Sequence, residues 1–307
     1  MRFLNPNTDF AFKKIFGSNE SKDILISFTN AMLRFHPGHE IVDLTIIDPY
    51  QAPKIKGMKD TYLDVKAISK DGREFIIEMQ VLNVAGFEKR ILYNAAKAYS
   101  MQLGEAEDYP NLNPVIALTI TDFIMFEASS KIISKFCLLD KDDFFKYPNS
   151  DLELVFVELP KFTKTEEQLV DITDKWIYFL KKAGSLEIVP KTLKVEKPIY
   201  RAFEIANKAN LTREELDDQE RREIFIQDQR GALTKAVTKA DEVGFKRGLQ
   251  EGRQEGLQKG MELAAQNLYD LYCERIITSE QAKSQLEKLY ANNSLSEDIY
   301  REFVSKI

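Results

Sequence analysis

Residues 59 to 80 read KDTYLDVKAISKDGREFIIEMQ. Apolar and polar side chains alternate on both sides of the central Asp71-Gly72 pair. An Asp-Gly pair between two alternating runs is a strong signal for a β-hairpin. The sequence therefore predicts two antiparallel strands joined by a tight loop. The first strand carries an acid, and the second carries an acid followed two residues later by an amide.

The length of the hairpin loop decides whether the acids of the two strands meet. A loop of two residues would place Asp64 and Glu78 on opposite faces of the hairpin. A loop of three residues, with Gly72 in the left-handed conformation, would place Asp64 directly opposite Glu78. A one-residue slip inverts every side chain, and only the longer loop gives one uniformly apolar face. That face would collect Leu63, Val65, Ala67, Phe75, Ile77 and Met79.

The other face of the hairpin has the character of a site. Two carboxylates directly opposite each other on a sheet, with Cβ atoms roughly 4.5 to 5.5 Å apart, repel each other. A cation between Asp64 and Glu78 would offset this repulsion. The remaining residues expected on this face are Tyr62, Lys66, Ile76 and Gln80.

At these residues the sequence resembles the PD-(D/E)xK nuclease superfamily, and within it the Rpn-type recombination-promoting nucleases, a transposase-like group. The resemblance covers about the first 130 residues. Leu63 stands where a proline can precede the acid, and Gln80 stands where the superfamily has a lysine. A glutamine there is similar to what the Rpn group carries. The matching segments are TDFAFKKIFG (8–17), YLDVKA (62–67), IIEMQ (76–80), FEKRILYNAAKAYSMQL (87–103) and YPNLNPVIALTITDFIMF (109–126).

The resemblance implies an α/β fold with an α-β-β-β-α-β core, followed here by a helical C-terminal region. It implies a metal-dependent deoxyribonuclease that hydrolyses phosphodiester bonds of DNA, linked to recombination or mobile DNA. The expected cofactor is Mg²⁺, or else Mn²⁺ or Ca²⁺, held by Asp64 and Glu78. Asp9 and the backbone carbonyl of Met79 are further candidate ligands. Asp9 can equally be a helix-start acid that pairs with Lys13 four residues later.

Four other positions are candidates for a part in the reaction. The amide of Gln80 would orient the attacking water, although it lacks the charge of a lysine. Lys66, two residues after Asp64 on the same face, is a hypothetical source of that missing charge. The resemblance implies that Arg90 and Tyr93 flank the active site, although an exposed helix face has the same spacing. Expected DNA contacts, or else plain surface lysines, are Lys54, Lys56 and Lys59.

Composition limits these expectations. The chain of 307 residues has a net charge of −6, and its first 130 residues hold 14 Lys or Arg against 17 Asp or Glu. A nucleic-acid-binding domain usually has a broad basic surface. The acidic balance thus favours an alternative, a catalytically inactive nucleic-acid-binding or assembly protein. No apolar run is long enough for a membrane span and no signal peptide is evident, so we expect a cytoplasmic protein.

We expect a nuclease-like domain over residues 1–165, a helical extension over 166–235 and a helical tail over 236–307. In the first domain Thr8 should cap a helix that ends at Gly17. A capping box at Thr212 and Glu215 should open a helix in the extension. Further strands are expected over residues 41–47, 115–120 and 152–159, and further helices over 87–103, 166–182 and 197–208.

Between residues 244 and 260 of the tail, every fourth residue is a glycine. Each glycine inside a helix costs roughly 1 kcal/mol relative to alanine, so a helix here needs a compensating contact. Four-residue spacing lines the glycines along one ridge, where two helices can approach closely. The tail therefore predicts a homo-oligomer or a contact with another surface, or else a flexible, frayed helix. The glycines are Gly244, Gly248, Gly252, Gly256 and Gly260.

Overall fold

The computed structural model describes residues 2–51, 61–104, 107–149, 151–292 and 294–307. The chain divides into two compact units, with the boundary between Arg230 and Gly231. The expected lysine contacts Lys54, Lys56 and Lys59 lie outside the described residues. None of the described helices is long and apolar enough to cross a membrane.

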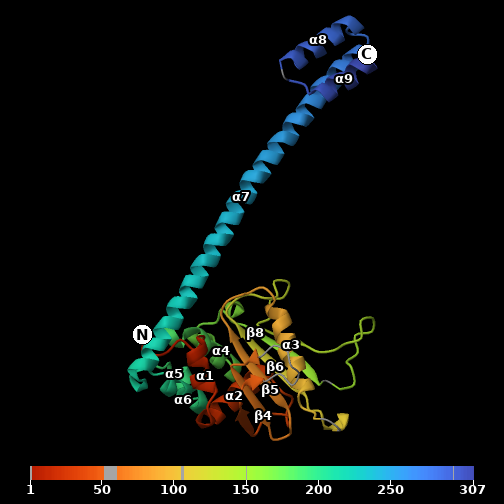
Figure 1. Ribbon diagram of the computed structural model, residues 1–307. Helices are drawn as coiled ribbons and strands as arrows, with labels where there is room; N and C mark the ends of the chain where they lie inside the picture. The colour runs from red at the N-terminus through yellow and green to blue at the C-terminus, as the bar shows by residue number, and fades with distance from the viewer. Residues whose placement is uncertain (1, 52–60, 105–106, 150, 293) are drawn as a thin grey trace. The chain divides into compact units, whose positions relative to one another are not determined.

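A six-stranded mixed sheet forms the centre of the first unit (Figure 1). The first three strands in the order are antiparallel, the next two run parallel to the third, and the last is an antiparallel edge strand. This arrangement confirms the predicted α-β-β-β-α-β core and adds an edge strand that was not predicted. The strand order is β1 (Leu44–Ile47), β4 (Val65–Ser69), β5 (Glu74–Gln80), β6 (Val115–Thr121), β8 (Leu152–Glu158) and β7 (Ile133–Phe136).

Helices cover both faces of the sheet (Figure 1). On one face lies α3 (Phe87–Ser100), whose apolar side chains pack with Ile76, Ala117 and Phe156. On the other face a cluster of aromatic rings, including Phe16, Phe28 and Trp176, joins several helices to the sheet. These helices are α1 (Asp9–Phe16), α2 (Lys22–Leu33), α4 (Ile172–Lys182), α5 (Lys191–Lys194) and α6 (Lys197–Ile205).

The helices after residue 165 share this core with the sheet. Trp176 and Phe179 of α4 and Phe203 of α6 are buried in the same cluster as Val155 of β8. The described contacts therefore divide the chain after Arg230, whereas the sequence led us to expect a boundary near residue 165.

The register of the hairpin is the one that the apolar pattern selected. Val65 lies opposite Ile77, and Ala67 lies opposite Phe75. The loop has three residues, because the N–H of Ser69 donates to the carbonyl of Arg73 at 2.9 Å. Gly72 closes the loop with φ +91°, in the left-handed region that glycine enters without strain.

The first strand departs from the expected pattern at its start. The ladder begins at Val65, and the chain bends just before it. Leu63 was expected beside Val65, but it packs with Ile76 in the cluster under α3. Before the bend, β3 (Thr61–Tyr62) pairs with β2 (Tyr50–Gln51) in a separate two-stranded ribbon. Leu63 and Val65 therefore pack in clusters on opposite faces of the sheet, with the bend at Asp64 between them.

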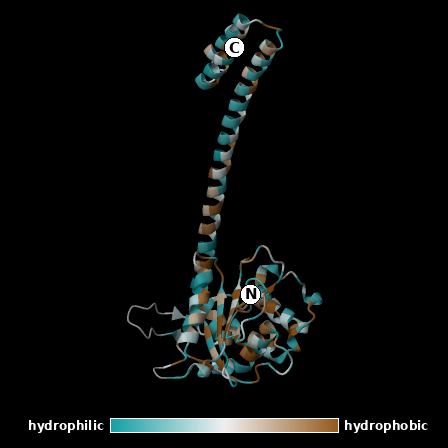
Figure 2. Cartoon of the chain, turned by 90° about the vertical axis from the view of Figure 1, so that its right-hand side faces the viewer, coloured by the Kyte–Doolittle hydropathy of each residue, from teal (hydrophilic) through white to brown (hydrophobic). Residues whose placement is uncertain are grey.

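Three helices form the rest of the described chain: α7 (Arg213–Cys273), α8 (Ser279–Ala291) and α9 (Glu297–Lys306). The expected capping box opens α7, since Thr212 and Glu215 exchange two hydrogen bonds. In the second unit, Leu286, Ile299 and Phe303 pack against the C-terminal turns of α7. Hydrophobic residues are spread along α7 among hydrophilic ones (Figure 2).

Candidate active site

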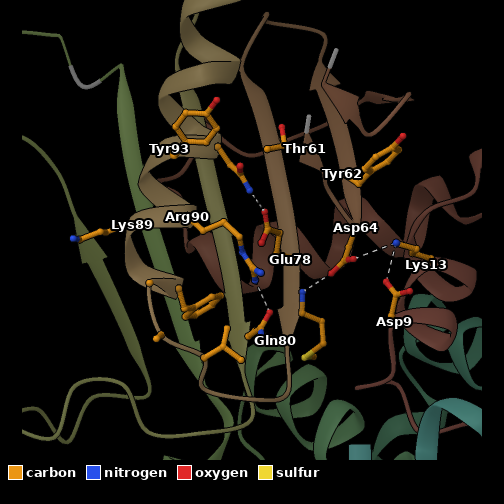
Figure 3. Close-up of a pocket in the computed structure, with 16 residues that line it drawn as sticks. Asp9, Lys13, Thr61, Tyr62, Asp64, Glu78, Gln80, Lys89, Arg90 and Tyr93 are labelled. Carbon is orange, nitrogen blue, oxygen red and sulfur yellow. Dashed lines mark hydrogen bonds and ion pairs between the residues drawn. The ribbon is translucent and has the colours of Figure 1, made fainter. Parts of the chain in front are cut away.

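A cavity of about 880 Å³ lies on the α3 side of the sheet, where β5 ends. Its walls come from α1, the β2–β3 ribbon, β5 and the first turns of α3. The charged side chains gather there from segments far apart in the sequence (Figure 3). The lining includes three acids and three bases, namely Asp9, Asp64, Glu78, Lys13, Lys89 and Arg90.

Asp64 is fixed by the backbone of the neighbouring strand. Its Oδ2 atom accepts a hydrogen bond from the N–H of Met79 at 2.9 Å. Burial raises the pKa of Asp64 to about 7, and a hydrogen bond with Asp9 acts in the same direction. The Met79 N–H and the charge of Lys13 oppose that rise in pKa without cancelling it. Asp64 is therefore a carboxyl that exchanges its proton near neutral pH.

Glu78 is buried opposite the bend that carries Asp64. Its side-chain Oε1 accepts a hydrogen bond from Nδ2 of Asn94 at 2.8 Å. Burial raises the pKa of Glu78, although Asn94 and the charges of Arg90 and Lys13 act against this. The Oδ1 atom of Asn94 is itself buried and has no hydrogen-bond partner among the described atoms.

Asp9 and Lys13 lie one turn apart on α1 and connect the site to two other elements. The Lys13 ammonium is 2.8 Å from Oδ1 of Asp9 and 3.4 Å from Oδ1 of Asp64. Arg222, from the first part of α7, contacts the other oxygen of Asp9 at 2.6 Å. Burial alone would raise the pKa of Asp9, but its hydrogen bonds and the two cations bring that pKa below its usual value. The two acids are therefore shifted in opposite directions, since the pKa of Asp9 is lowered and the pKa of Asp64 is raised.

Gln80 holds Arg90 in place. Its Oε1 atom accepts from Nη2 of Arg90 at 2.7 Å, and its Nε2 donates to the carbonyl of Leu82 at 2.7 Å. The Arg90 guanidinium also lies over the ring of Phe87, 5.2 Å from its centre. Each end of the Gln80 amide thus has one protein partner, and each keeps a second hydrogen-bonding position with which it could orient a water.

Of the remaining residues that were predicted to belong to the site, two line the cavity and one does not. Tyr93 and Met79 line the cavity. Lys66 does not line it, because its ammonium forms a 2.7 Å ion pair with Glu74. The ammonium that lies beside Asp64 is that of Lys13, at 3.4 Å.

The structure places three further residues in the site or beside it, namely Lys13, Asn94 and Arg222. From the sequence Lys13 was only a partner of Asp9 or a possible phosphate contact, and the other two had no role in the site. The first two had a signal, since Lys13 follows Asp9 by four residues and Asn94 follows Arg90 by four. Arg222 had none, because its contact with Asp9 spans more than two hundred residues.

The oxygen atoms of the cavity include possible ligands for a divalent cation. Hard cations such as Mg²⁺ take oxygen ligands, chiefly carboxylates and carbonyls. Asp64 and Glu78 offer two carboxylates, and the unpartnered Oδ1 of Asn94 offers a third oxygen. The ammonium of Lys13 already lies between two acids of the cavity, so this place attracts positive charge. These side chains fit such an ion by their chemistry, although in the described ranges no group of three or more His, Cys, Asp or Glu residues is arranged so that it could hold a metal ion.

Comparison with known proteins gives one match. The model of a family described as PD-(D/E)XK nuclease family transposase matches residues 6–236. No curated protein matches the chain. No solved structure matches it either.

Proposed function

Because the chain belongs to the PD-(D/E)XK nuclease family transposases, we propose that it is a metal-dependent DNA endonuclease linked to recombination or mobile DNA. Nuclease-like function follows from the family, and the metal, the substrate and the site residues are our proposal. The observation that supports it best is a pair of acids in one cavity, the half-buried Asp64 and the buried Glu78, both with raised pKa values. Acids with perturbed pKa values in a cleft are typical of active sites.

We assign the metal site to Asp64 and Glu78, with Asn94 and the carbonyl of Met79 as further oxygen donors. The ion would be Mg²⁺, or else Mn²⁺ or Ca²⁺. When bound, it would polarise the scissile phosphate and lower the pKa of the attacking water. Asp9 contacts two cations of the protein itself, and we assign it the role of holding Lys13 beside Asp64.

We assign the positive charges of the reaction to Lys13 and Arg90. Lys13 is next to Asp64, where it can stabilise negative charge that develops on the phosphate. Arg90 is fixed by Gln80 and Phe87 at the opening of the cavity, where it can hold a neighbouring phosphate. Gln80 then acts by positioning Arg90, in place of the charge that a lysine would carry.

Nicking of supercoiled plasmid tests the proposal. Wild-type protein should nick the plasmid with Mg²⁺ or Mn²⁺ and not in EDTA, and Glu78→Gln should abolish nicking. Glu88→Gln is the matched control, because Glu88 is an exposed residue in the first turn of α3 that does not line the cavity. Absence of nicking by the wild type with either metal would contradict the proposed activity. The inactive binding or assembly protein would then be the better account.

We also propose that the protein forms a homo-oligomer through the glycine ridge of α7, defined as Gly244, Gly248, Gly252, Gly256 and Gly260. These glycines lie inside a continuous helix, and each lowers the stability of that helix relative to alanine. Apart from the adjacent residues and the nearby backbone of the helix itself, no described atom lies within 4 Å of a Cβ built on any of them. The ridge is therefore open to a second helix.

A further inference from the structure

Two exposed tyrosines stand at the candidate active site. Tyr62 is 73% exposed and Tyr93 is 37% exposed, and both line the cavity. In Figure 3 the Tyr93 ring lies on the α3 side of Glu78, and the Tyr62 ring lies on the opposite side, beside Asp64. The acids of the site therefore lie between two aromatic side chains that come from different elements.

The ring of Tyr62 has a defined orientation. It stacks on the ring of Tyr50 with centres 4.7 Å apart and an angle of 29° between the planes. Tyr50 and Tyr62 face each other across the β2–β3 ribbon. A ring that is supported from one side and still largely exposed is a ready surface for another flat group.

The rest of the cavity also suits a nucleobase better than a second row of phosphates. Val84, an exposed apolar residue, lines the wall before α3. The basic residues of the described lining are Lys13, Lys89 and Arg90, and Lys13 is already shared between two acids. A protein that binds a duplex through its backbone can make on the order of 6 to 10 phosphate contacts, more than these three basic residues could supply. Few charges and several apolar or aromatic groups instead favour contacts with base faces.

In a duplex the base faces are stacked on each other and closed to such rings. In an unpaired strand they are free, and base–aromatic stacking tolerates any sequence. We infer that the cavity binds unpaired DNA, with the bases on either side of the scissile phosphate stacked on Tyr62 and Tyr93. This inference rests on the proposed function for the position of the phosphate. It adds a substrate class, namely single strands, flaps or locally unpaired sites.

Binding is measured by fluorescence anisotropy with a fluorescein-labelled oligodeoxynucleotide of mixed sequence. The same strand is used alone and annealed to its complement, and EDTA prevents cleavage. The wild type should bind the single strand more tightly than the duplex. Tyr62→Ala and Tyr93→Ala should each weaken single-strand binding about five- to 150-fold.

Two controls separate stacking from other effects. Tyr62→Phe keeps the ring without the hydroxyl and should bind like the wild type. Tyr109→Ala removes a tyrosine that is 81% exposed and does not line the cavity, and it should leave binding unchanged. Circular dichroism of each variant confirms that it is folded.

Several outcomes would overturn the inference. Equal or tighter binding of the duplex contradicts it, as does the absence of binding to either DNA. Equal effects of the Tyr62, Tyr93 and Tyr109 alanine variants contradict it as well, and a loss in Tyr62→Phe would assign the effect to the hydroxyl. Tyrosine-dependent single-strand binding without plasmid nicking would refute the nuclease alone. Nicking with a preference for duplex would refute the stacking alone.

Discussion

Asp64 is subject to opposing influences that nearly balance near neutral pH. Burial and the proximity of Asp9 favour its neutral form, whereas Lys13 and the Met79 N–H favour its charged form. The first pair dominates, and the pKa of Asp64 is about 7 instead of 3.8. A metal ion needs the charged form, so proton release and metal binding are coupled at this residue.

We predict that metal affinity increases as the pH rises through 7. Below the pKa of Asp64, about 7, a proton occupies the carboxyl and competes with the ion. Isothermal titration with Mn²⁺ between pH 5.5 and 8.5, roughly the range over which such a group ionises, measures the effect. Asp64→Asn should weaken binding and reduce the pH dependence to the part that comes from Glu78, whose pKa is also raised. A flat profile in the wild type would show that Asp64 is charged throughout.

The same shift in pKa has a consequence for folding. The folded-state pKa of Asp64 lies above its ordinary value, so the folded protein binds this proton more tightly than the unfolded chain. Its contribution to stability is fully present below about pH 4 and is lost as the pH rises through about 7. At high pH the charged and buried carboxylate therefore opposes folding, which metal binding would relieve.

Lys13 and Lys66 should have separable effects. Lys13→Met removes the cation beside Asp64, and we expect it to reduce plasmid nicking while the fold is kept. Lys66→Met leaves Glu74 buried without its ion pair, which costs several kcal/mol in stability. Thermal melting measures the stability of each variant. Nicking is then assayed at a temperature where all variants are folded, so that the two effects are distinguished. Loss of nicking in Lys66→Met alone would restore Lys66 as the cation of the reaction.

At the scale of elements, the hairpin loop sets the position of both acids. Gly72 has φ +91°, and a Cβ at this position would lie 2.3 Å from Oδ1 of Asn113. Asn113 in turn exchanges two hydrogen bonds with Gln102 through its main chain. The loop is therefore packed against the segment that leads into β6, and this contact fixes its length.

We predict that Gly72→Ala lowers the free energy of unfolding by at least about 2 kcal/mol, from left-handed strain and the clash together. Gly38→Ala is the matched control, because Gly38 has φ +87° with no atom within 4 Å of an added Cβ. It should lose only about 1 to 2 kcal/mol. Urea denaturation measures both, and equal losses would show that the contact with Asn113 contributes nothing.

A second element-level contact joins the start of α7 to α1. The hydroxyl of Thr8 donates to Oε1 of Gln219 at 2.8 Å, and Lys14 pairs with Glu215 at 2.5 Å. Together with the ion pair between Arg222 and Asp9, these contacts join α1 to the start of α7. The position of Asp9 and Lys13 in the site thus depends on a helix that follows them by about two hundred residues.

At the scale of the whole molecule, the two units differ in how they are stabilised. The first has a large core shared by the sheet and five helices and a second cluster under α3, whereas the second unit packs only around its C-terminal helices. The glycine ridge lies on the part of α7 between the boundary and that smaller core. The five glycines of the ridge are exposed.

We predict that Gly248→Ala combined with Gly252→Ala raises helix content and disrupts self-association. Each alanine favours the helix by about 1 kcal/mol but fills the ridge where a partner would approach. Circular dichroism and light scattering after size exclusion measure the two effects. Gly231→Ala is the control, because Gly231 lies in α7 outside the ridge and also has open space around it. An unchanged mass would exclude the ridge as the contact.

The sequence by itself determined the sheet core and the register of the hairpin. These depend on alternation and turn chemistry between neighbouring residues, which a chain carries wherever it folds. Only the tertiary structure decided which cation serves Asp64 and what Gln80 and Lys66 bind. It also decided that Leu63 changes faces. These outcomes depend on how α1, α3 and α7 pack against the sheet, and residues that meet by packing leave no periodic signal in the sequence.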